Sequence, residues 1–146
     1  SKLFGEKHIS KLVDSIAFGS YNKRFKGEDD KAWLTGDMLV REKYLADPWC
    51  NYKFTVSAMA DLVTLNKNSN LRETFEKTPK DMPIYVISGS DDPVGDYGEG
   101  VEKVVSGYKA ADCKAELKLY EGYRHEILND KSHEKVLVDI IKFISK

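Results

Sequence analysis

Residues 83–95, with the sequence PIYVISGSDDPVG, constrain the fold more than any other stretch of the chain. They begin with an apolar run of β-branched and aromatic side chains that is bounded by Gly89. Such a run predicts a strand buried on both faces of a parallel sheet. The polar residues after it accept turn geometry, so the strand should end in a loop that presents carboxylates. Open α/β sheets carry their functional sites at this end of their strands.

A helix and a second strand are predicted directly after this loop. Residues 99–110 carry apolar side chains at the spacing of one helix face. Residues 115–120 alternate between apolar and polar, which is typical of a half-buried strand near a sheet edge. Strand, helix and strand together predict one parallel βαβ unit. The loops after its two strands would then lie at one rim of the sheet, with Asp92 and His125 on the same side.

Both loops carry a recognisable motif. Residues 89–94, GSDDPV, are similar to an acid loop of the form G-x-x-D-P-[VI], and residues 122–129, GYRHEILN, to a histidine loop of the form G-x-x-H-E-x-x-N. With the two motifs in this order, the chain resembles the C-terminal part of an α/β-hydrolase. The branch that it resembles comprises the lysophospholipases and monoacylglycerol lipases and is grouped with the serine aminopeptidases. The resemblance implies that Asp92 is the acid and His125 the base of a catalytic triad.

The remaining member of such a triad, the serine, is not found in its expected motif. A serine hydroxyl is a poor nucleophile until an imidazole takes its proton, and a carboxylate must hold that imidazole in the right tautomer. In this fold the serine comes first in the chain and lies in G-x-S-x-G. That motif does not occur here, and Ser20 and Ser90 follow a glycine but lack the second one. We therefore expect the nucleophile on a preceding N-terminal segment and expect this chain alone to be inactive.

Two predicted strands are too few for a hydrolase sheet. The chain has 146 residues, and its 41% apolar and 11% aromatic content is typical of a globular protein. A strand as apolar as residues 83–87 also needs paired neighbours and covered faces. We therefore expect an α/β fold that is the C-terminal portion of a hydrolase, with its last two parallel strands, their flanking helices and a helical cap before them. The partner of this chain would be the N-terminal half of the same hydrolase.

Two regions are predicted along the chain. Residues 1–78 should form the helical cap region with its connecting helices, and residues 79–146 the C-terminal part of the hydrolase core with the acid and histidine loops. Apolar spacing and capping residues favour helices at residues 2–18, 37–45, 55–63 and 71–77, and after Ser132. The resemblance implies that the cap shapes the acyl pocket and shields it from water. The acidic pair Asp29 and Asp30 is interpreted as solvated charge.

Other side chains are weaker site candidates. The large apolar residues of the cap are interpreted as ordinary core, with a substrate-lining role as the alternative for any one of them. They are Trp33, Trp49, Tyr52, Phe54 and Met59. Asp91 is the alternative to Asp92, and without the resemblance either would be read as a turn carboxylate bonded to its own backbone. The Asp-Pro step of the motif selects Asp92. His8 and His133 are poorer candidates for the base than His125.

Charge and cysteine spacing exclude further classes of function. A net charge of −1 and a pI near 6.3 provide no field that favours nucleic acid or an anionic membrane. Cys50 and Cys113 lack metal-ligand spacing, and the acidic residues around Asp92 do not match an EF-hand loop. We expect no metal and no cofactor. Since no signal peptide or membrane-spanning run is found, we also expect no stable membrane insertion, no nucleic-acid partner and a cytoplasmic location.

The resemblance implies a serine hydrolase that cleaves carboxylic esters such as lysophospholipids or monoacylglycerols. A small lipid or ester would then be its substrate. Three alternatives remain open. The nucleophile could be an aspartate, as in the related epoxide hydrolases and dehalogenases, or the substrate could be a peptide with a free N-terminus. The chain could also be a non-catalytic binding module derived from a hydrolase.

Overall fold

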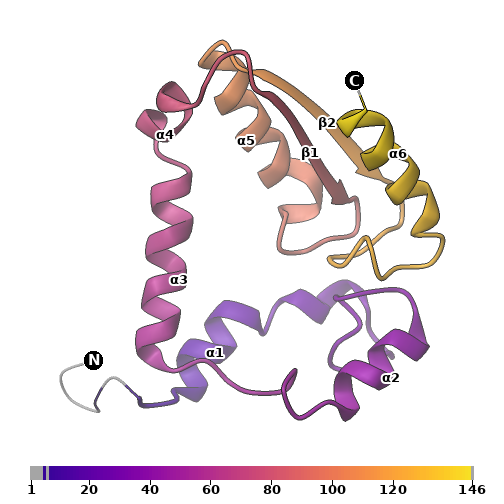
Figure 1. Cartoon of the computed structure of the whole chain (residues 1–146). Helices are drawn as coiled ribbons and strands as arrows, with labels where there is room; N and C mark the ends of the chain where they lie inside the picture. The colour runs from indigo at the N-terminus through magenta and orange to yellow at the C-terminus, as the bar shows by residue number, and fades with distance from the viewer. Residues whose placement is uncertain (1–4, 6, 146) are drawn as a thin grey trace.

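The computed structural model describes residue 5 and residues 7–145 of the chain. The elements follow in the order α1 (Lys11–Phe18), the 3₁₀ helix η1 (Tyr21–Arg24), α2 (Met38–Ala46), α3 (Val56–Ser69), α4 (Arg72–Lys77), β1 (Pro83–Gly89), the 3₁₀ helix η2 (Asp96–Gly98), α5 (Glu99–Ala110), β2 (Lys114–Tyr120) and α6 (Glu134–Ile144). In Figure 1, α1 and α2 form a lower layer, and the strands with α4, α5 and α6 form an upper one. α3 runs between the two layers along one side.

The sheet consists, in the described residues, of β1 and β2, which pair in parallel along their whole length. α5 connects the two strands, so the predicted βαβ unit is confirmed. Side chains alternate along a strand, which lets two helices cover opposite faces of the pair. On one face, Tyr85 stacks on Phe143 of α6 with ring centroids 4.9 Å apart. On the other, Leu119 lies against Gly98 at the start of α5, where an added Cβ would be 2.8 Å from its Cδ1 atom.

The main core cluster lies between β2, the histidine loop and α6. Val136 of α6 has no exposed surface and packs there with Tyr120 and Ile127. α6 begins at Glu134, and the residue before it makes no side-chain cap. The prediction that Ser132 caps this helix is therefore wrong, because Ser132 adopts a left-handed backbone conformation with φ of 60°. The apolar face of α6 is also buried only in part, since three of its members remain exposed: Leu137, Ile141 and Ile144.

The helices of the lower layer begin at polar caps. Ser10, Asp37 and Thr55 each accept hydrogen bonds from backbone N–H groups in the first turns of α1, α2 and α3. α2, α3 and α4 confirm three predicted helices. The helix predicted at residues 2–18 is confirmed only from Lys11 onward, because Ser10 caps it there. Residues 5 and 7–10 are not helical, and the prediction for residues 2–4 and 6 lies outside the described residues.

One charged side chain of the cap is deeply buried. Arg41 of α2 is 3% exposed and pairs with Glu28 at 2.9 Å and with Asp29 at 2.7 Å. A buried guanidinium is costly unless it is paired, and these two carboxylates provide the pairing. The interpretation of Asp29 as solvated charge is therefore wrong, whereas Asp30 is exposed as interpreted.

The large apolar side chains of the cap have mixed outcomes. Met59 is buried, as predicted for a core residue, and Trp33 is half-buried. Trp49, Tyr52 and Phe54 are exposed, so the interpretation of these three as ordinary core is wrong. They lie in or beside the segment between α2 and α3, which runs over the surface of the lower layer.

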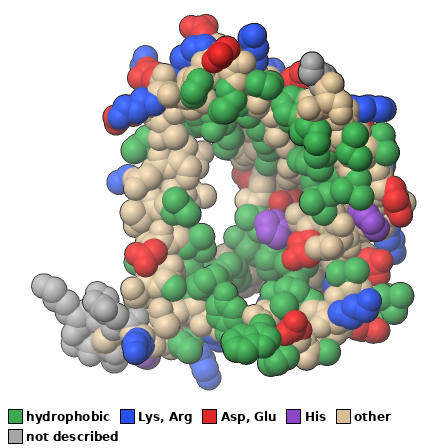
Figure 2. All heavy atoms as spheres, in the orientation of Figure 1, with side chains coloured by type: hydrophobic (Ala, Val, Ile, Leu, Met, Phe, Trp, Pro, Cys, Tyr) green, Lys and Arg blue, Asp and Glu red, His purple; other side chains and the backbone are tan. Residues whose placement is uncertain are grey.

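β1 is less covered than its sequence predicts. Residues 84–87 were expected to be buried on both faces but are only half-buried. Among the described residues β1 pairs with β2 alone, so its other edge carries unpaired backbone groups. Figure 2 shows that the molecule is hollowed by an opening beside α3, with hydrophobic side chains along its border. An apolar strand with an open edge next to such a hollow is typical of a surface that another polypeptide segment covers.

α3 is the longest described helix, and it has little tertiary support. Met59 is its one buried residue, and every residue from 61 to 70 is exposed. A helix of 14 residues is marginal in water without packing of an apolar face. No helix of the described chain, α3 included, combines the length and apolar character needed to cross a bilayer. α3 thus connects the two layers (Figure 1).

Candidate active site

The loop after β1 holds Asp92 in a fixed orientation. Its carboxylate is 8% exposed and accepts a hydrogen bond from the Val94 N–H at 2.8 Å through Oδ1. The Ser88 hydroxyl lies 3.5 Å from Oδ2. The Asp92 carbonyl accepts from the Tyr97 N–H at 2.9 Å, which closes the loop. These contacts come from the turn chemistry that the sequence of this loop predicts.

The acid and histidine loops are joined backbone to backbone. The Ser90 N–H donates to the Tyr120 carbonyl and the Asp91 N–H to the Tyr123 carbonyl, both at 2.9 Å. The Ser90 hydroxyl accepts from the Gly122 N–H at 2.8 Å. Asp91 therefore serves this junction through its backbone N–H. Of the two sequence candidates for the acid, the structure places Asp92 against His125.

His125 faces Asp92 across this rim of the sheet. Its Nδ1 atom lies 3.1 Å from Oδ2 and 3.2 Å from Oδ1 of Asp92. The side chain is 38% exposed, so the ring is accessible although its inner nitrogen is engaged. The hydrogen bond with Asp92 raises the pKa of His125 above its usual value, the negative charges of Asp92 and Glu126 act in the same direction, and burial opposes them. The pair predicted from the two loop motifs is thus brought together.

The raised pKa of His125 has a consequence for stability. A group whose pKa is higher in the folded state contributes stability that is fully present below its unfolded pKa, about 6.5, and is lost as pH rises through the folded value. The difference in unfolding free energy between the wild type and His125→Gln should therefore shrink from pH 5.5 to pH 8.5, as measured by urea denaturation. In an Asp92→Asn background the same difference should be nearly flat. A flat difference in the native background would contradict the assigned contact.

An aromatic row, of which the sequence analysis names only Trp33, leads from His125 into the lower layer. The Trp33 ring lies 5.3 Å from the His125 ring, and Tyr21 lies 5.0 Å from Trp33. Phe18 follows at 5.8 Å from Tyr21. Burial raises the pKa of Tyr21, and the negative charge of Asp92 acts in the same direction. No periodicity or motif marks these residues, because the row forms only when η1 and the following loop fold over the histidine loop.

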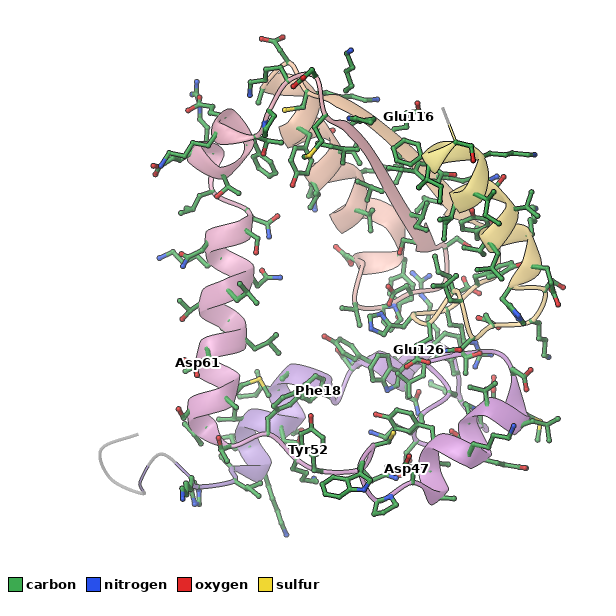
Figure 3. The ribbon with its side chains drawn as sticks, in the orientation of Figure 1. Phe18, Asp47, Tyr52, Asp61, Glu116 and Glu126 are labelled. Carbon is green, nitrogen blue, oxygen red and sulfur yellow. The ribbon has the colours of Figure 1, made fainter. Side chains whose placement is uncertain are left out.

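A cavity in the lower layer adjoins this row. Its volume is about 450 Å³, and it is lined in part by Phe18, Trp33, Tyr44, Cys50, Tyr52 and Phe54. Figure 3 shows Phe18 and Tyr52 within the lower layer and Glu126 where the two layers meet. Trp33 lines the cavity and also contacts His125, so it connects the two. A second cavity of about 480 Å³ lies between α4 and α5 and contains neither Asp92 nor His125.

Metal ligation is a further possibility for clustered acidic, histidine and cysteine side chains. No group of three or more His, Cys, Asp or Glu side chains within residues 7–145 is arranged to hold a metal ion. Cys50 is half-buried and Cys113 buried, and both are free thiols. What the arrangement around Asp92 and His125 can do is transfer protons, because a carboxylate on Nδ1 leaves Nε2 of the imidazole to act as a base.

The chain is similar to one protein family and to several solved structures. A family model described as serine aminopeptidase, S33, matches residues 3–132. A thermostable carboxyl esterase from Bacillus coagulans, solved with glycerol, is 28% identical with a TM-score of 0.88 over 96% of this chain and 46% of that one. A lipase in its open form is 23% identical, with a TM-score of 0.84 over 99% of this chain and 47% of the lipase chain. A soluble variant of the Saccharomyces cerevisiae monoglyceride lipase, solved with a substrate analogue, is 19% identical. Its TM-score is 0.62 over 96% of this chain and 53% of the lipase chain. Among curated proteins nothing matches.

The chain spans about half the length of these solved structures. The matches at 23% and 19% identity show the fold alone. Together with the two-stranded parallel sheet and its flanking helices, they confirm the predicted fold class, the C-terminal portion of an α/β-hydrolase fold.

Proposed function

The chain belongs to the serine aminopeptidase S33 family of α/β-hydrolases, and from this membership we propose that it supplies the acid and the base of a serine hydrolase. One observation carries the proposal: Nδ1 of His125 lies 3.1 Å from a buried carboxylate oxygen of Asp92. Asp92 fixes the tautomer with the proton on Nδ1, so that Nε2 can accept the proton of a serine hydroxyl. The serine itself would come from the N-terminal half.

The reaction proceeds in two halves. The serine oxygen attacks the ester carbonyl while Nε2 of His125 takes its proton, and Asp92 stabilises the imidazolium. The imidazolium then gives this proton to the departing alcohol, which leaves an acyl-serine. Water repeats the sequence with His125 again as the base, releasing the carboxylic acid and the free serine. Each step uses the half-exposed ring of His125 at the rim of the sheet.

We propose carboxylic esters as substrates, with small lipids such as lysophospholipids or monoacylglycerols as the finer assignment. The 28% identical carboxyl esterase supports the ester class. The cap cavity of about 450 Å³ supports a small amphipathic substrate, because pockets of such size and aromatic lining typically bind small molecules. A peptide with a free N-terminus is the second candidate, favoured by the description of the matching family.

The proposed partner is the N-terminal half of the same hydrolase. The open edge of β1, its half-buried side chains and the hollow beside α3 support a partner that adds a strand to β1 and fills the hollow. In this arrangement residues 1–78 act as the cap with its connecting helices and residues 79–146 as part of the core. We further propose a cytoplasmic location, with neither stable membrane insertion nor a nucleic-acid partner, and the two free thiols accord with a reducing compartment.

An active-site probe tests this division of roles. A fluorophosphonate reacts with an activated serine, so it should label the N-terminal segment of the native, purified hydrolase and leave this chain unlabelled. Denaturing mass spectrometry of the labelled sample locates the adduct, and a heat-denatured sample is the control. An adduct on Ser20, Ser88 or Ser90 would overturn the assignment. A chain that is folded and monodisperse without any nucleophile-bearing segment would instead favour the binding module.

A further inference from the structure

The histidine loop is attached to the cap as well as to the acid loop. The cap residues involved, 28–36, are called the clamp segment here. The His125 N–H donates to the Trp33 carbonyl at 3.3 Å, and the Glu126 N–H donates to the Leu34 carbonyl at 2.7 Å. The backbone on both sides of the imidazole is therefore fixed by the clamp segment, and a shift of this segment would move His125 relative to Asp92.

Arg124, the residue before His125, ties the clamp segment to the loop. Its Nη1 donates to the Ala32 carbonyl at 2.6 Å, and its two terminal nitrogens reach the two carboxylate oxygens of Glu28 at 2.8 and 3.1 Å. The side chain is 15% exposed, and its guanidinium lies 4.1 Å from the centre of the Phe25 ring. Bidentate pairs of this kind are among the strongest and most directional in proteins. The hydrogen bond from Arg124 is the largest of the contacts that lower the pKa of Glu28.

Two further buried groups fix the same junction. Arg41 shares Glu28 with Arg124 and donates to the Thr35 carbonyl at 2.7 Å. Asp130, at 5% exposure, accepts from the Gly36 N–H at 3.0 Å and from the Arg124 N–H at 2.9 Å. Charged side chains thus hold the clamp segment at both of its ends. Each of these side chains also has hydrogen-bonding partners, and buried charges are retained under that condition.

The acid loop has a much lighter attachment to the cap. In η2, directly after this loop, the Tyr97 ring has the guanidinium of Arg24 3.3 Å from its centre. Within the described chain, the clamp segment is therefore bonded more extensively to the histidine loop than to the acid loop. The distance between Asp92 and His125 then depends on the contacts that fix the position of the clamp segment.

We propose that Arg124 is a positioning residue for His125. Its contacts with Glu28 and Ala32 fix the clamp segment, and the clamp segment in turn keeps the imidazole next to Asp92. Its kinetic consequence rests on the proposed function, whereas its geometric consequence does not. Arg124 does not act through its charge on the ring. Removal of a nearby positive charge would raise the pKa of His125, whereas loss of the Asp92 contact would lower it. The two explanations therefore predict shifts of opposite sign.

The test follows the ring of His125 by NMR in Arg124→Gln. The groups that face this ring are Asp92 from the acid loop, Glu126 from its own loop and Trp33 from the clamp segment, and the substitution keeps all three. The titration midpoint of His125 should fall towards the usual value of about 6.5. A midpoint that rises or stays unchanged in the folded variant would overturn the proposal.

Two variants guard against a loss of folding. Arg124→Lys keeps the charge but cannot form the bidentate pair, so it should lower the midpoint by part of the full shift. Glu28→Gln leaves Arg124 in place and removes a carboxylate that is 35% exposed, so this variant is expected to fold. If Arg124→Gln is unfolded, an unchanged midpoint in Glu28→Gln overturns the proposal. Arg72→Gln is the matched control, because its pair with Glu76 is exposed and far from the site.

Kinetics of the full hydrolase, this chain together with its nucleophile-bearing half, separate the two proposals. Arg124→Gln should lower kcat by about 100-fold with KM nearly unchanged, since a displacement near 1 Å costs about this much. If the NMR midpoint falls but the wild type has no esterase activity, the proposed function fails and the positioning role stands. If the wild type is active, and neither kcat nor the midpoint responds to Arg124→Gln, the positioning role fails and the function stands.

Discussion

His125→Ala is expected to lower kcat of the full hydrolase by roughly 10⁵- to 10⁶-fold, the scale seen when the histidine of a serine triad is removed. If His125 is the base of the proposed triad, its removal leaves the proposed serine nucleophile without the group that takes its proton. The fold should survive, because the ring is 38% exposed and contributes little to the core. Steady-state hydrolysis of a short-chain p-nitrophenyl ester measures the loss, and circular dichroism checks the fold.

His133→Ala is the matched control, since His133 lies at the start of α6, outside the acid and histidine loops. It should leave kcat nearly unchanged, because His133 belongs to neither loop of the proposed acid–base pair. The fluorophosphonate should also react much more slowly with the serine in His125→Ala. Turnover that persists in a folded His125→Ala variant would refute the assignment of the base.

Gly89→Ala is expected to destabilise the chain by about 3 kcal/mol or more, at the high end for a single substitution. Gly89 ends β1 and lies directly against the histidine loop. An added Cβ would stand 2.0 Å from the Tyr123 carbonyl oxygen and 2.5 Å from that of Arg124. Both are backbone atoms, so no side-chain rotation relieves the clash. The two loops would have to separate, and Asp92 would move away from His125.

Urea denaturation measures this loss, and Gly122→Ala is the control. Gly122 has φ of 75° and no atom within 4 Å of an added Cβ. Its substitution costs only the strain of a left-handed alanine, about 1 to 2 kcal/mol. Gly89→Ala should therefore be clearly the more destabilising of the two and should also reduce kcat more. Equal effects would contradict the close packing of Gly89 against the backbone of the histidine loop.

Local sequence patterns predicted the part of the fold that carries the acid and the base. β1, α5 and β2 were identified because apolar periodicity and turn residues act within a few positions of each other. Parallel pairing then determined that both loops meet at one rim. The approach of Asp92 and His125 followed from this topology, since neither residue is close to the other in sequence.

The clamp segment could not be predicted in the same way. Glu28 and Arg124 are 96 positions apart, and each looks like an ordinary surface charge in its local sequence. Asp29 was misread for this reason, because nothing near it indicates that Arg41 is buried. The burial of β1 was overestimated on different grounds. Its sequence specifies two covered faces and two neighbours, and the described chain provides only one of the neighbours.

The length of α3 determines how the lower layer is rotated relative to the upper one. Its 14 residues span about 21 Å, and each added residue would turn everything on one side of it by about 100°. The cap is also held to the histidine loop through Glu28 and Arg124, so it cannot follow such a turn without breaking that pair. A change of seven residues, about two full turns, would restore the orientation but would still shift one side by about 10 Å along the helix axis, so it too should break the pair. Single insertions there should act like active-site mutations although they lie in the most exposed helix of the chain.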